Sequence, residues 1–450
     1  MEEIESALRS MEGYTLLLKG APGSGKTTFA VSLLEQICTG DSKGAYISTR
    51  IDPTALYKQF PGLEERIPVK NVIDGTQSEF SEARSQVLYE DLTSFLGGVY
   101  SVVAEEDVII LILDSWDAVS FQIGEENRGV EKLETSMLDI ARKTKTHLIL
   151  ISEYTGEKRL DYLVDAILRL EKGEIDGRIM RKVFIDKLRG FKVLRNNYPF
   201  TLEGGEFTHF ATPASGLGSG RHRVIMRGWI HGNYSTGIED LDTIIGGYPK
   251  GGFVLLELMD GSISQGYRPF LYHTLADFML NGHGVLYMPE DGSSSVKRLL
   301  LDYVSEELLA KNLRMPTASE SGREEPCLFH VGAESVSLDK YFEIYKELKK
   351  PVLHVLDLTA LNLYGEDEIR RMIQGIVSWV RTTEDVLIGV SKPSARLKNE
   401  IRELADLHLR FFPINGTLNF YGVKPHTVIY NVSSSRAREG HHQLKLTLIV

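Results

Sequence analysis

The segment Gly20-Ala-Pro-Gly-Ser-Gly-Lys-Thr27 has the residue types and the spacing needed to bind phosphate. Its glycines let backbone N–H groups turn toward an anion, and a helix that starts there adds the positive end of its dipole. Lys26 is expected to reach the β- and γ-phosphates, and the Thr27 hydroxyl is expected to help hold Mg²⁺. The sequence therefore predicts a bound nucleoside triphosphate, ATP, together with Mg²⁺. The predicted cofactor-binding residues are Gly20, Ala21, Pro22, Gly23, Ser24, Gly25, Lys26, Thr27 and Thr28.

The elements that position this loop are predicted from the spacing of apolar residues. Short β-like apolar runs alternate with helical patterns in the first half, which implies a parallel sheet with helices on both faces. A terminal antiparallel pair, near Lys182–Lys187 and Phe200–Phe210, is expected to extend the sheet. The expected strands are Thr15–Lys19, Gly44–Ser48, Val108–Leu113, His147–Ser152 and Ala166–Leu170, with helices near Thr27–Cys38 and Val130–Lys143.

Asp114 follows the predicted strand Val108–Leu113 and is the second candidate metal residue. Nucleoside triphosphatases place a carboxylate at the end of such a strand to orient the Mg²⁺ shell. The alternative is an ordinary strand-terminal Asp before a turn. Because the phosphate loop is intact, the metal role is favoured. Thr27 and Asp114 are thus predicted to hold the metal, and Lys26 and Asp114 are predicted catalytic residues.

Composition restricts the class of protein. At 450 residues, two or three domains are expected. The chain is 42% hydrophobic and 25% charged, as soluble proteins are, and it has no apolar run of about 18 residues that predicts a membrane span. The acidic start is unlike a secretory signal, and two cysteines without metal-ligand spacing suit the cytoplasm. A net charge of −11 disfavours broad nucleic-acid binding, although a local basic patch would still allow it.

The second half of the chain repeats the pattern of the first. A shift of 241 residues brings together the framing glycines of the phosphate loop and several other residues whose neighbours also agree. Matches at a nearly constant offset over both halves indicate an internal repeat. The matching pairs are Gly20 with Gly261, Gly25 with Gly266, Tyr46 with Tyr287 and Asp165 with Asp406, and Val108–Asp114 resembles Val352–Asp357 with a two-residue slip.

The phosphate loop of the second copy is degenerate. Tyr267 stands where Lys is required, and Arg268 stands where the Mg²⁺-binding hydroxyl is required. A phenol lacks the ammonium charge, and an Arg at the metal position repels Mg²⁺. We predict domains at 1–211, with the intact loop, and at 223–450, without a functional one, joined by a flexible Gly-rich linker at 212–222. Residues 316–326 are predicted to form a mobile surface loop.

Further motifs resemble a known superfamily. The segments Ser235-Thr-Gly-Ile-Glu-Asp-Leu-Asp242 and Gly246-Gly-Tyr-Pro-Lys-Gly251 resemble the leader of RecA-like ATPases of the KaiC and RadA type. Lys187-Leu-Arg189-Gly190, followed by Tyr198-Pro-Phe200, resembles the Lys-Leu-Arg-Gly segment of KaiC. The shortened leader of the first half and its Ile-Ser-Thr-Arg-Ile strand resemble GvpD-like archaeal regulatory proteins. The resemblance implies an α/β fold of two tandem RecA/KaiC-like P-loop domains, each a mostly parallel sheet flanked by helices.

The same resemblance implies that Lys187 and Arg189 act in catalysis on the site of a neighbouring subunit in a homo-oligomer, a hexamer in KaiC. An added cation there offsets charge in phosphoryl transfer. The alternative is that the basic run from Arg178 to Arg195 is only a solvated strand face.

One departure from the KaiC pattern predicts slow turnover. KaiC-type enzymes carry a Glu-Glu pair just after the second strand, one of which activates water, whereas this chain has Arg50-Ile51. Arg stays protonated at neutral pH and cannot act as a base. Asp52 and Glu153 are candidate substitutes. The second copy keeps acids, Glu290-Asp291, but lacks the phosphate loop.

Three functions are compared. The first is an ATP-binding, slowly hydrolysing regulatory ATPase whose nucleotide state controls assembly or a protein partner. The second is a DNA-associated ATPase of the RecA/RadA type, which the net acidity disfavours. The third is an autokinase, because Ser433-Ser-Ser435 aligns loosely with the region where KaiC phosphorylates itself, although a short Ser run is more often a loop.

Overall fold

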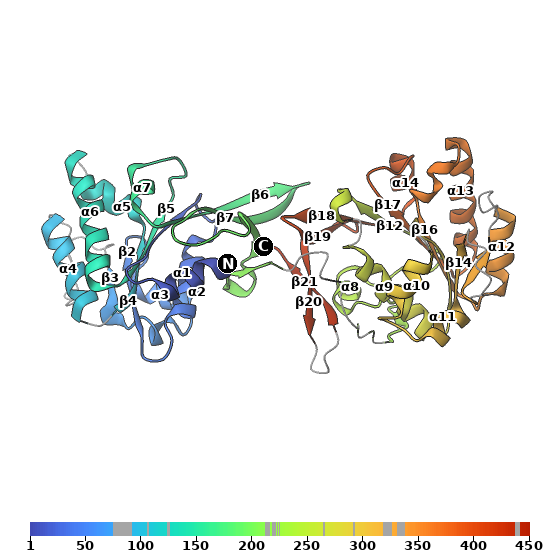
Figure 1. The fold of residues 1–450 in the computed structure, drawn as a ribbon, viewed down its shortest axis with the longest axis horizontal. Helices are drawn as coiled ribbons and strands as arrows, with labels where there is room; N and C mark the ends of the chain where they lie inside the picture. The colour runs from blue at the N-terminus through green and yellow to red at the C-terminus, as the bar shows by residue number, and fades with distance from the viewer. Residues whose placement is uncertain are drawn as a thin grey trace. The chain divides into compact units, whose positions relative to one another are not determined.

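The computed structural model describes the whole chain except residues 75–91, 106–107, 124–126, 212–216, 218–221, 223, 225, 264–265, 291–292, 318–325, 331–337 and 437–441. The chain divides into two compact units, Met1–Phe210 with Ile449–Val450, and Ala211–Leu448 (Figure 1). Most of the predicted linker and most of the predicted loop at 316–326 lie outside the described residues. The start of that loop is wrong, because Pro316 and Thr317 belong to strand β14, Leu313–Thr317. No helix in the described part of the chain is both long and apolar enough to cross a membrane.

The first unit is built on a mostly parallel sheet with the strand order β3-β2-β4-β5-β1-β6-β7-β8-β9. The strands from β3 to β6 run parallel, and the strands beyond β6 are antiparallel. Their bounds are β1 Thr15–Lys19, β2 Lys43–Ser48, β3 Val72–Asp74, β4 Val108–Asp114, β5 His147–Ser152, β6 Ala166–Ile175, β7 Arg178–Leu188, β8 Asn197–Thr201 and β9 Thr208–His209.

Helices cover both faces of this sheet, because the central strands are apolar on both sides. In β1, Leu16 and Leu18 pack in the same core as Phe29 of α2, whereas Leu17 packs with Phe95 of α4 and Met137 of α6. The helices are α1 Glu2–Ser10, α2 Lys26–Ile37, α3 Pro53–Gln59, α4 Leu92–Glu105, α5 Trp116–Ile123, α6 Asn127–Thr144 and α7 Arg159–Leu163.

The second unit has a sheet with the order β15-β14-β13-β16-β17-β12-β18-β19-β20-β21 and a separate pair, β10 and β11. Its strands are β10 Trp229–Ile230, β11 Asn233–Tyr234, β12 Phe253–Leu258, β13 Gly284–Met288, β14 Leu313–Thr317, β15 Leu328–His330, β16 Val352–Asp357, β17 Val386–Ser391, β18 Leu407–Ile414, β19 Thr417–Lys424, β20 Tyr430–Arg436 and β21 His442–Leu448. Its helices are α8 Glu239–Ile245, α9 Arg268–Leu280, α10 Ser293–Leu300, α11 Glu306–Asn312, α12 Leu338–Glu347, α13 Glu366–Thr382 and α14 Lys398–Leu404.

The two sheets share one strand order, since β2-β4-β5-β1-β6-β7 of the first corresponds to β13-β16-β17-β12-β18-β19 of the second. A local contact is also shared. Asp165 accepts a hydrogen bond of 3.1 Å from the backbone N–H of Thr15, and Asp406 accepts one of 2.9 Å from that of Phe253. In each unit the acceptor therefore fixes the first residue of the central strand. The predicted fold class, two mostly parallel α/β domains of P-loop type, is confirmed.

Three details of the elements differ from the sequence analysis. The segment Phe200–Phe210 is not one strand, because a 3₁₀ turn at Glu203–Gly205, with Gly204 and Gly205 at positive φ, separates β8 from β9. Sequence reasoning also missed the long hairpin of β6 and β7. In the second unit, Ser433–Ser435 lie in β20 and pair with β21 instead of forming a loop.

Candidate nucleotide-binding site

The phosphate loop joins β1 to α2 and depends on glycine at two close approaches. A Cβ on Gly20 would lie 2.4 Å from the carbonyl oxygen of Leu170 and 2.6 Å from Oγ of Ser24. Gly25 caps α2 at a φ of 99°, and a Cβ there would lie 2.8 Å from Leu202. Side chains at these two positions would push the loop out of shape. The glycines therefore allow the backbone to curl tightly at the N-terminus of α2, where anions are favoured.

Lys26 and Thr27 begin α2 and face the expected phosphate position from one side. The Lys26 ammonium donates hydrogen bonds to the carbonyl oxygens of Gly20, at 2.8 Å, and Ala21, at 3.0 Å. Burial lowers the pKa of Lys26, and the nearby carboxylates of Glu153 and Asp114 oppose that shift. A phosphate would supply the negative charge that the neutral carbonyls lack.

Asp114 closes the site from the end of β4. Thr27 Oγ1 donates a hydrogen bond of 2.7 Å to Asp114 Oδ2, which brings together the two residues predicted to hold Mg²⁺. Hydroxyl and carboxylate oxygens are the ligands that Mg²⁺ prefers. Asp114 precedes a cis peptide bond to Ser115, and the Ser115 N–H donates to Thr49 Oγ1 at 3.0 Å.

Tyr46 is a site residue that sequence reasoning did not assign. Its buried hydroxyl donates a hydrogen bond of 2.8 Å to the same oxygen of Asp114 that Thr27 contacts. Burial, with the neighbouring Asp114 charge, raises the pKa of Tyr46 well above its usual value, so Tyr46 remains a donor. The match of Tyr46 with Tyr287 in the repeat was the signal that could have identified it.

The phosphate loop, Lys26, Thr27 and Asp114 border a cavity of about 340 Å³. The Oγ of Ser24 is buried and has no hydrogen-bond partner among the described residues. A phosphate oxygen could therefore accept a hydrogen bond from this hydroxyl. The donor set therefore fits ATP–Mg²⁺. The lining residues are Pro22, Gly23, Gly25, Lys26, Thr27, Thr28, Ser48, Arg50, Ile51, Gln59, Asp114, Ile151, Glu153 and Leu202.

Arg50 and Glu153 form an ion pair on the wall of this cavity. The hydrogen bond from Arg50 lowers the pKa of Glu153, and the same contact raises the pKa of Arg50. Asp52, the other candidate base, is exposed and caps α3 by accepting a hydrogen bond of 3.0 Å from the Ala55 N–H. It is absent from the residues that line the described cavity. Of the two candidates, only Glu153 reaches the site.

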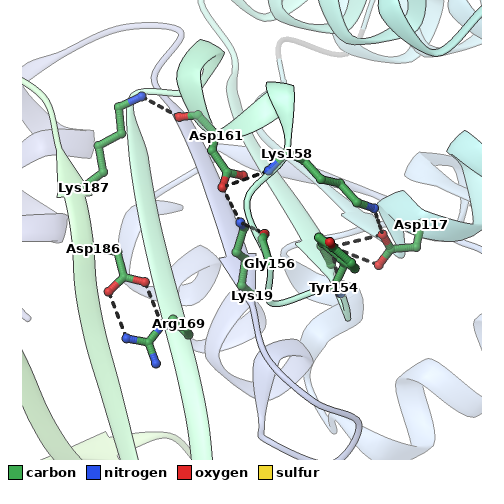
Figure 2. Close-up of polar contacts among 10 residues, drawn as sticks. Lys19, Asp117, Tyr154, Gly156, Lys158, Asp161, Arg169, Asp186 and Lys187 are labelled. Carbon is green, nitrogen blue, oxygen red and sulfur yellow. Dashed lines mark hydrogen bonds and ion pairs between the residues drawn. The ribbon is translucent and has the colours of Figure 1, made fainter. Parts of the chain in front are cut away.

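The loop after β5 is anchored on two sides (Figure 2). Asp117 of α5 accepts hydrogen bonds from the Glu153 N–H, at 2.6 Å, and from Ser152 Oγ, at 3.0 Å, and it lies 3.5 Å from the Lys158 ammonium. Lys19, the last residue of β1, donates to the Gly156 carbonyl oxygen at 2.8 Å. The loop is therefore tied to α5 at Glu153 and, at Gly156, to the strand that leads into the phosphate loop.

Lys187 and Arg189 lie at and just beyond the end of β7, away from the cavity of their own unit. The Lys187 ammonium donates to the Asp161 carbonyl oxygen at 2.7 Å (Figure 2). Arg189 donates to the Tyr162 carbonyl oxygen at 2.8 Å. Both cations thus contact the last turn of α7, where the helix dipole is negative. Neither belongs to the residues that line the described cavity.

Arg181, in contrast, does not belong to a solvated strand face. It is buried on β7 and donates a hydrogen bond of 3.0 Å to the carbonyl oxygen of Gly23 in the phosphate loop. Burial lowers the pKa of Arg181. Sequence reasoning placed this residue only within a general basic run, because it could not pair β7 with the loop.

Two described side chains distinguish the equivalent place in the second unit. Tyr267 is 1% exposed and packs within the hydrophobic core. Lys392, which follows β17, lies 2.8 Å from the carboxylate of Asp357 and also pairs with Glu290. An ammonium group therefore sits on the acidic residue that corresponds to Asp114.

Comparison with known proteins agrees with this geometry. A model of the GvpD gas vesicle protein P-loop domain matches residues 4–186. The chain is 25% identical to Protein GvpD2 of Halobacterium salinarum over 96% of its own length and 92% of that protein. It is 23% identical to Circadian clock protein KaiC2 of Synechocystis sp. over 68% of this chain and 55% of that protein. A UPF0273 protein of Aeropyrum pernix is 26% identical over 42% of this chain and 81% of that protein.

The matched family model includes the phosphate loop, and two of these relatives are similar over most of this chain. The chain is GvpD-like, and these matches support a P-loop ATPase of the RecA/KaiC type.

Proposed function

We propose that the first unit binds ATP–Mg²⁺ and hydrolyses it slowly, and that the nucleotide state regulates a protein partner or the assembly of the chain in the cytoplasm. The observation that carries this proposal is the 2.7 Å hydrogen bond between Thr27 and Asp114 in a cavity that Lys26 also lines. The likeness to GvpD and KaiC proteins supports a regulatory P-loop ATPase in general terms.

Each site residue has one role in this proposal. Lys26 exchanges the carbonyl oxygens that it now contacts for phosphate oxygens, and Thr27 and Asp114 hold the metal. When bound, Mg²⁺ neutralises charge on the phosphate oxygens. Slow turnover is expected because Arg50 and Ile51 occupy the place of the Glu-Glu pair of KaiC-type enzymes.

The second unit is proposed to bind no nucleotide. Tyr267 supplies no cation for a phosphate, and Lys392 already neutralises Asp357 at 2.8 Å. A metal ion would have to displace that ammonium group. The second unit would then act in structure or regulation.

The decisive experiment is a calorimetric titration with ATP in Mg²⁺, joined to a measurement of phosphate release. Lys26→Ala should abolish binding, and EDTA should weaken it strongly in the parent chain. Lys58→Ala, which removes an exposed cation nearby, is the matched control and should bind normally. The proposal fails if the parent chain does not bind ATP.

A further inference from the structure

The two strands beside β4, which ends at Asp114, are each followed by a charged residue, and the two charges are opposite. Arg50 follows β2, and Glu153 follows β5, and these two strands flank β4 in the sheet. The side chains of Arg50 and Glu153 are 49% and 28% exposed and form an ion pair beside the cavity. The pair therefore joins the two strands on either side of the predicted metal residue.

We propose that this pair is a switch: the γ-phosphate of ATP takes Arg50 from Glu153, and the freed Glu153 carboxylate becomes the base that activates water. This inference rests on the proposed function, because it needs ATP in the first unit. In this proposal the catalytic base follows β5, whereas the glutamate pair of KaiC-type enzymes follows the second strand.

The exchange of partners is favourable for Arg50. A guanidinium group binds phosphate through parallel hydrogen bonds, and the γ-phosphate offers more negative charge than one carboxylate. Since half-exposed ion pairs contribute little to stability, the pair with Glu153 is easily broken. ADP lacks the γ-phosphate and would leave the pair intact, so Arg50 should distinguish ATP from ADP.

The exchange also changes what Glu153 can do. In the pair, the hydrogen bond from Arg50 lowers the pKa of Glu153 and occupies its oxygen, so the carboxylate is a weak base. Once Arg50 moves to the phosphate, that carboxylate can accept a proton. Because Asp117 holds the Glu153 N–H at 2.6 Å, the side chain can turn without displacing the main chain.

The chemical step balances with these residues. The water oxygen forms a bond to the γ-phosphorus while the bond from that phosphorus to the bridging oxygen breaks, and ADP leaves with the electron pair. The proton of the water passes to Glu153 and then to solvent. Glu153 is thus regenerated, and Arg50 can return to it when phosphate departs.

The second unit has an ion pair between the corresponding positions, Lys392 and Glu290. Lys392 follows β17, as Glu153 follows β5, and Glu290 lies in the turn after β13, as Arg50 lies after β2. The signs of the charges are reversed. The fold therefore brings side chains from these two turns into contact in both units. The first unit has its carboxylate after β5, beside the intact phosphate loop, and the second has its carboxylate after β13.

The test compares Arg50→Ala and Glu153→Gln, with Asp52→Asn as the matched control. Arg50→Ala should weaken binding of a non-hydrolysable ATP analogue by about ten- to hundredfold, as expected for loss of a charge-assisted contact, with ADP affinity unchanged. Glu153→Gln should keep ATP affinity and lose roughly 100-fold or more in hydrolysis. Asp52→Asn can still cap α3 and should change neither.

The outcomes separate the two proposals. If the parent chain binds no ATP, the proposed function fails and the switch fails with it. If the parent binds ATP but Arg50→Ala weakens ATP and ADP equally, the switch alone is overturned. Hydrolysis that survives in Glu153→Gln, or that is absent from a parent chain that binds ATP, overturns the role of Glu153 as base.

Discussion

Glu153 and Lys392 occupy the same register position in the two sheets and carry opposite charges. In the first sheet Asp114 of β4 pairs with Ile151, and Glu153 lies two residues beyond Ile151. In the second sheet Asp357 of β16 pairs with Val390, and Lys392 lies two residues beyond Val390. In the first unit the position supplies a carboxylate to an open cavity. In the second it supplies an ammonium group that binds the acid directly. One position thus separates a site open to a metal ion from one that carries its own cation.

The first prediction is that each chain binds one ATP. Lys26 lines a cavity in the first unit, whereas Lys392 neutralises Asp357 in the second. Calorimetry should therefore give a stoichiometry near one in the parent chain and no binding in Lys26→Ala.

The control for this prediction is Tyr267→Phe, which keeps the buried ring that Tyr267→Ala would delete from the core. It should leave the stoichiometry unchanged. A value near two in the parent chain contradicts the prediction.

The second prediction concerns Tyr46→Phe. Asp114 Oδ2 would lose one of its two hydrogen bonds, and the carboxylate would be less well oriented toward a metal. Loss of a hydrogen bond to a charged group costs about 1.5–3 kcal/mol. We expect a lower free energy of unfolding and a severalfold higher Mg²⁺ concentration for half-maximal ATP binding.

Tyr57→Phe is the matched control for Tyr46→Phe. It removes a hydroxyl that donates to the Ile67 carbonyl oxygen at 2.7 Å, in the same unit but outside the cavity lining. It should lower stability without changing the Mg²⁺ requirement. If both variants shift the requirement equally, Tyr46 has no specific role at Asp114.

Local sequence patterns were sufficient for the central strands and the phosphate loop. Apolar runs and a fixed loop motif depend on neighbours in the chain, and β1 and β5 have the predicted bounds. The internal repeat was also visible in the sequence, where a shift of 241 residues matches Asp165 with Asp406. In the structure, each of these aspartates accepts a hydrogen bond from the first residue of a strand.

Contacts between distant segments were not visible in the same way. Arg50 and Glu153 are 103 positions apart, and only the strand order brings them together. Arg181 likewise reaches Gly23 through the pairing of β6 and β7, which no local pattern predicted. The sequence offered Asp52 and Glu153 as equal candidates, and the capping role of Asp52 distinguishes them.

The third prediction is a loss of stability in acid that depends on His222. Its ring stacks on Tyr303 at 4.4 Å, with His273 and His442 nearby, and neither ring nitrogen has a partner among the described residues. Burial lowers the pKa of His222 to about 3. Because the unfolded chain binds a proton near pH 6.5 and the folded chain does not, stability should fall as the pH decreases from 6.5 toward 3.

His222→Phe keeps an aromatic ring against Tyr303 and removes the titrating group. Its thermal unfolding midpoint should therefore decrease less than that of the parent chain between neutral pH and pH 4.5, about two units below the ordinary His value. His426→Gln, at an exposed position, should behave as the parent does. Equal acid sensitivity in parent and His222→Phe chains would show that another group is responsible.

The last prediction is that Arg189 acts on the site of a neighbouring subunit. Arg189 and Lys187 contact the last turn of α7 and do not line the described cavity of their own unit. The Arg189 side chain is 50% exposed, so it is accessible to a second copy. A head-to-tail interface of this kind closes into a ring or continues as a filament. We expect ATP to favour assembly, into a hexamer if the resemblance to KaiC extends to assembly, and Arg189→Ala to bind ATP without hydrolysing it.

Mixing variants gives the sharpest test of this arrangement. Lys26→Ala chains lack a working phosphate loop but supply Arg189, and Arg189→Ala chains have the opposite defect. At a shared interface the mixture should regain part of the activity that neither variant has alone. Lys192→Ala, an exposed cation of the same basic segment, should remain active by itself. A mixture that stays inactive, together with a monomeric mass in saturating ATP–Mg²⁺, would restrict Arg189 to its contact with α7, because no neighbouring site would then exist for it to reach.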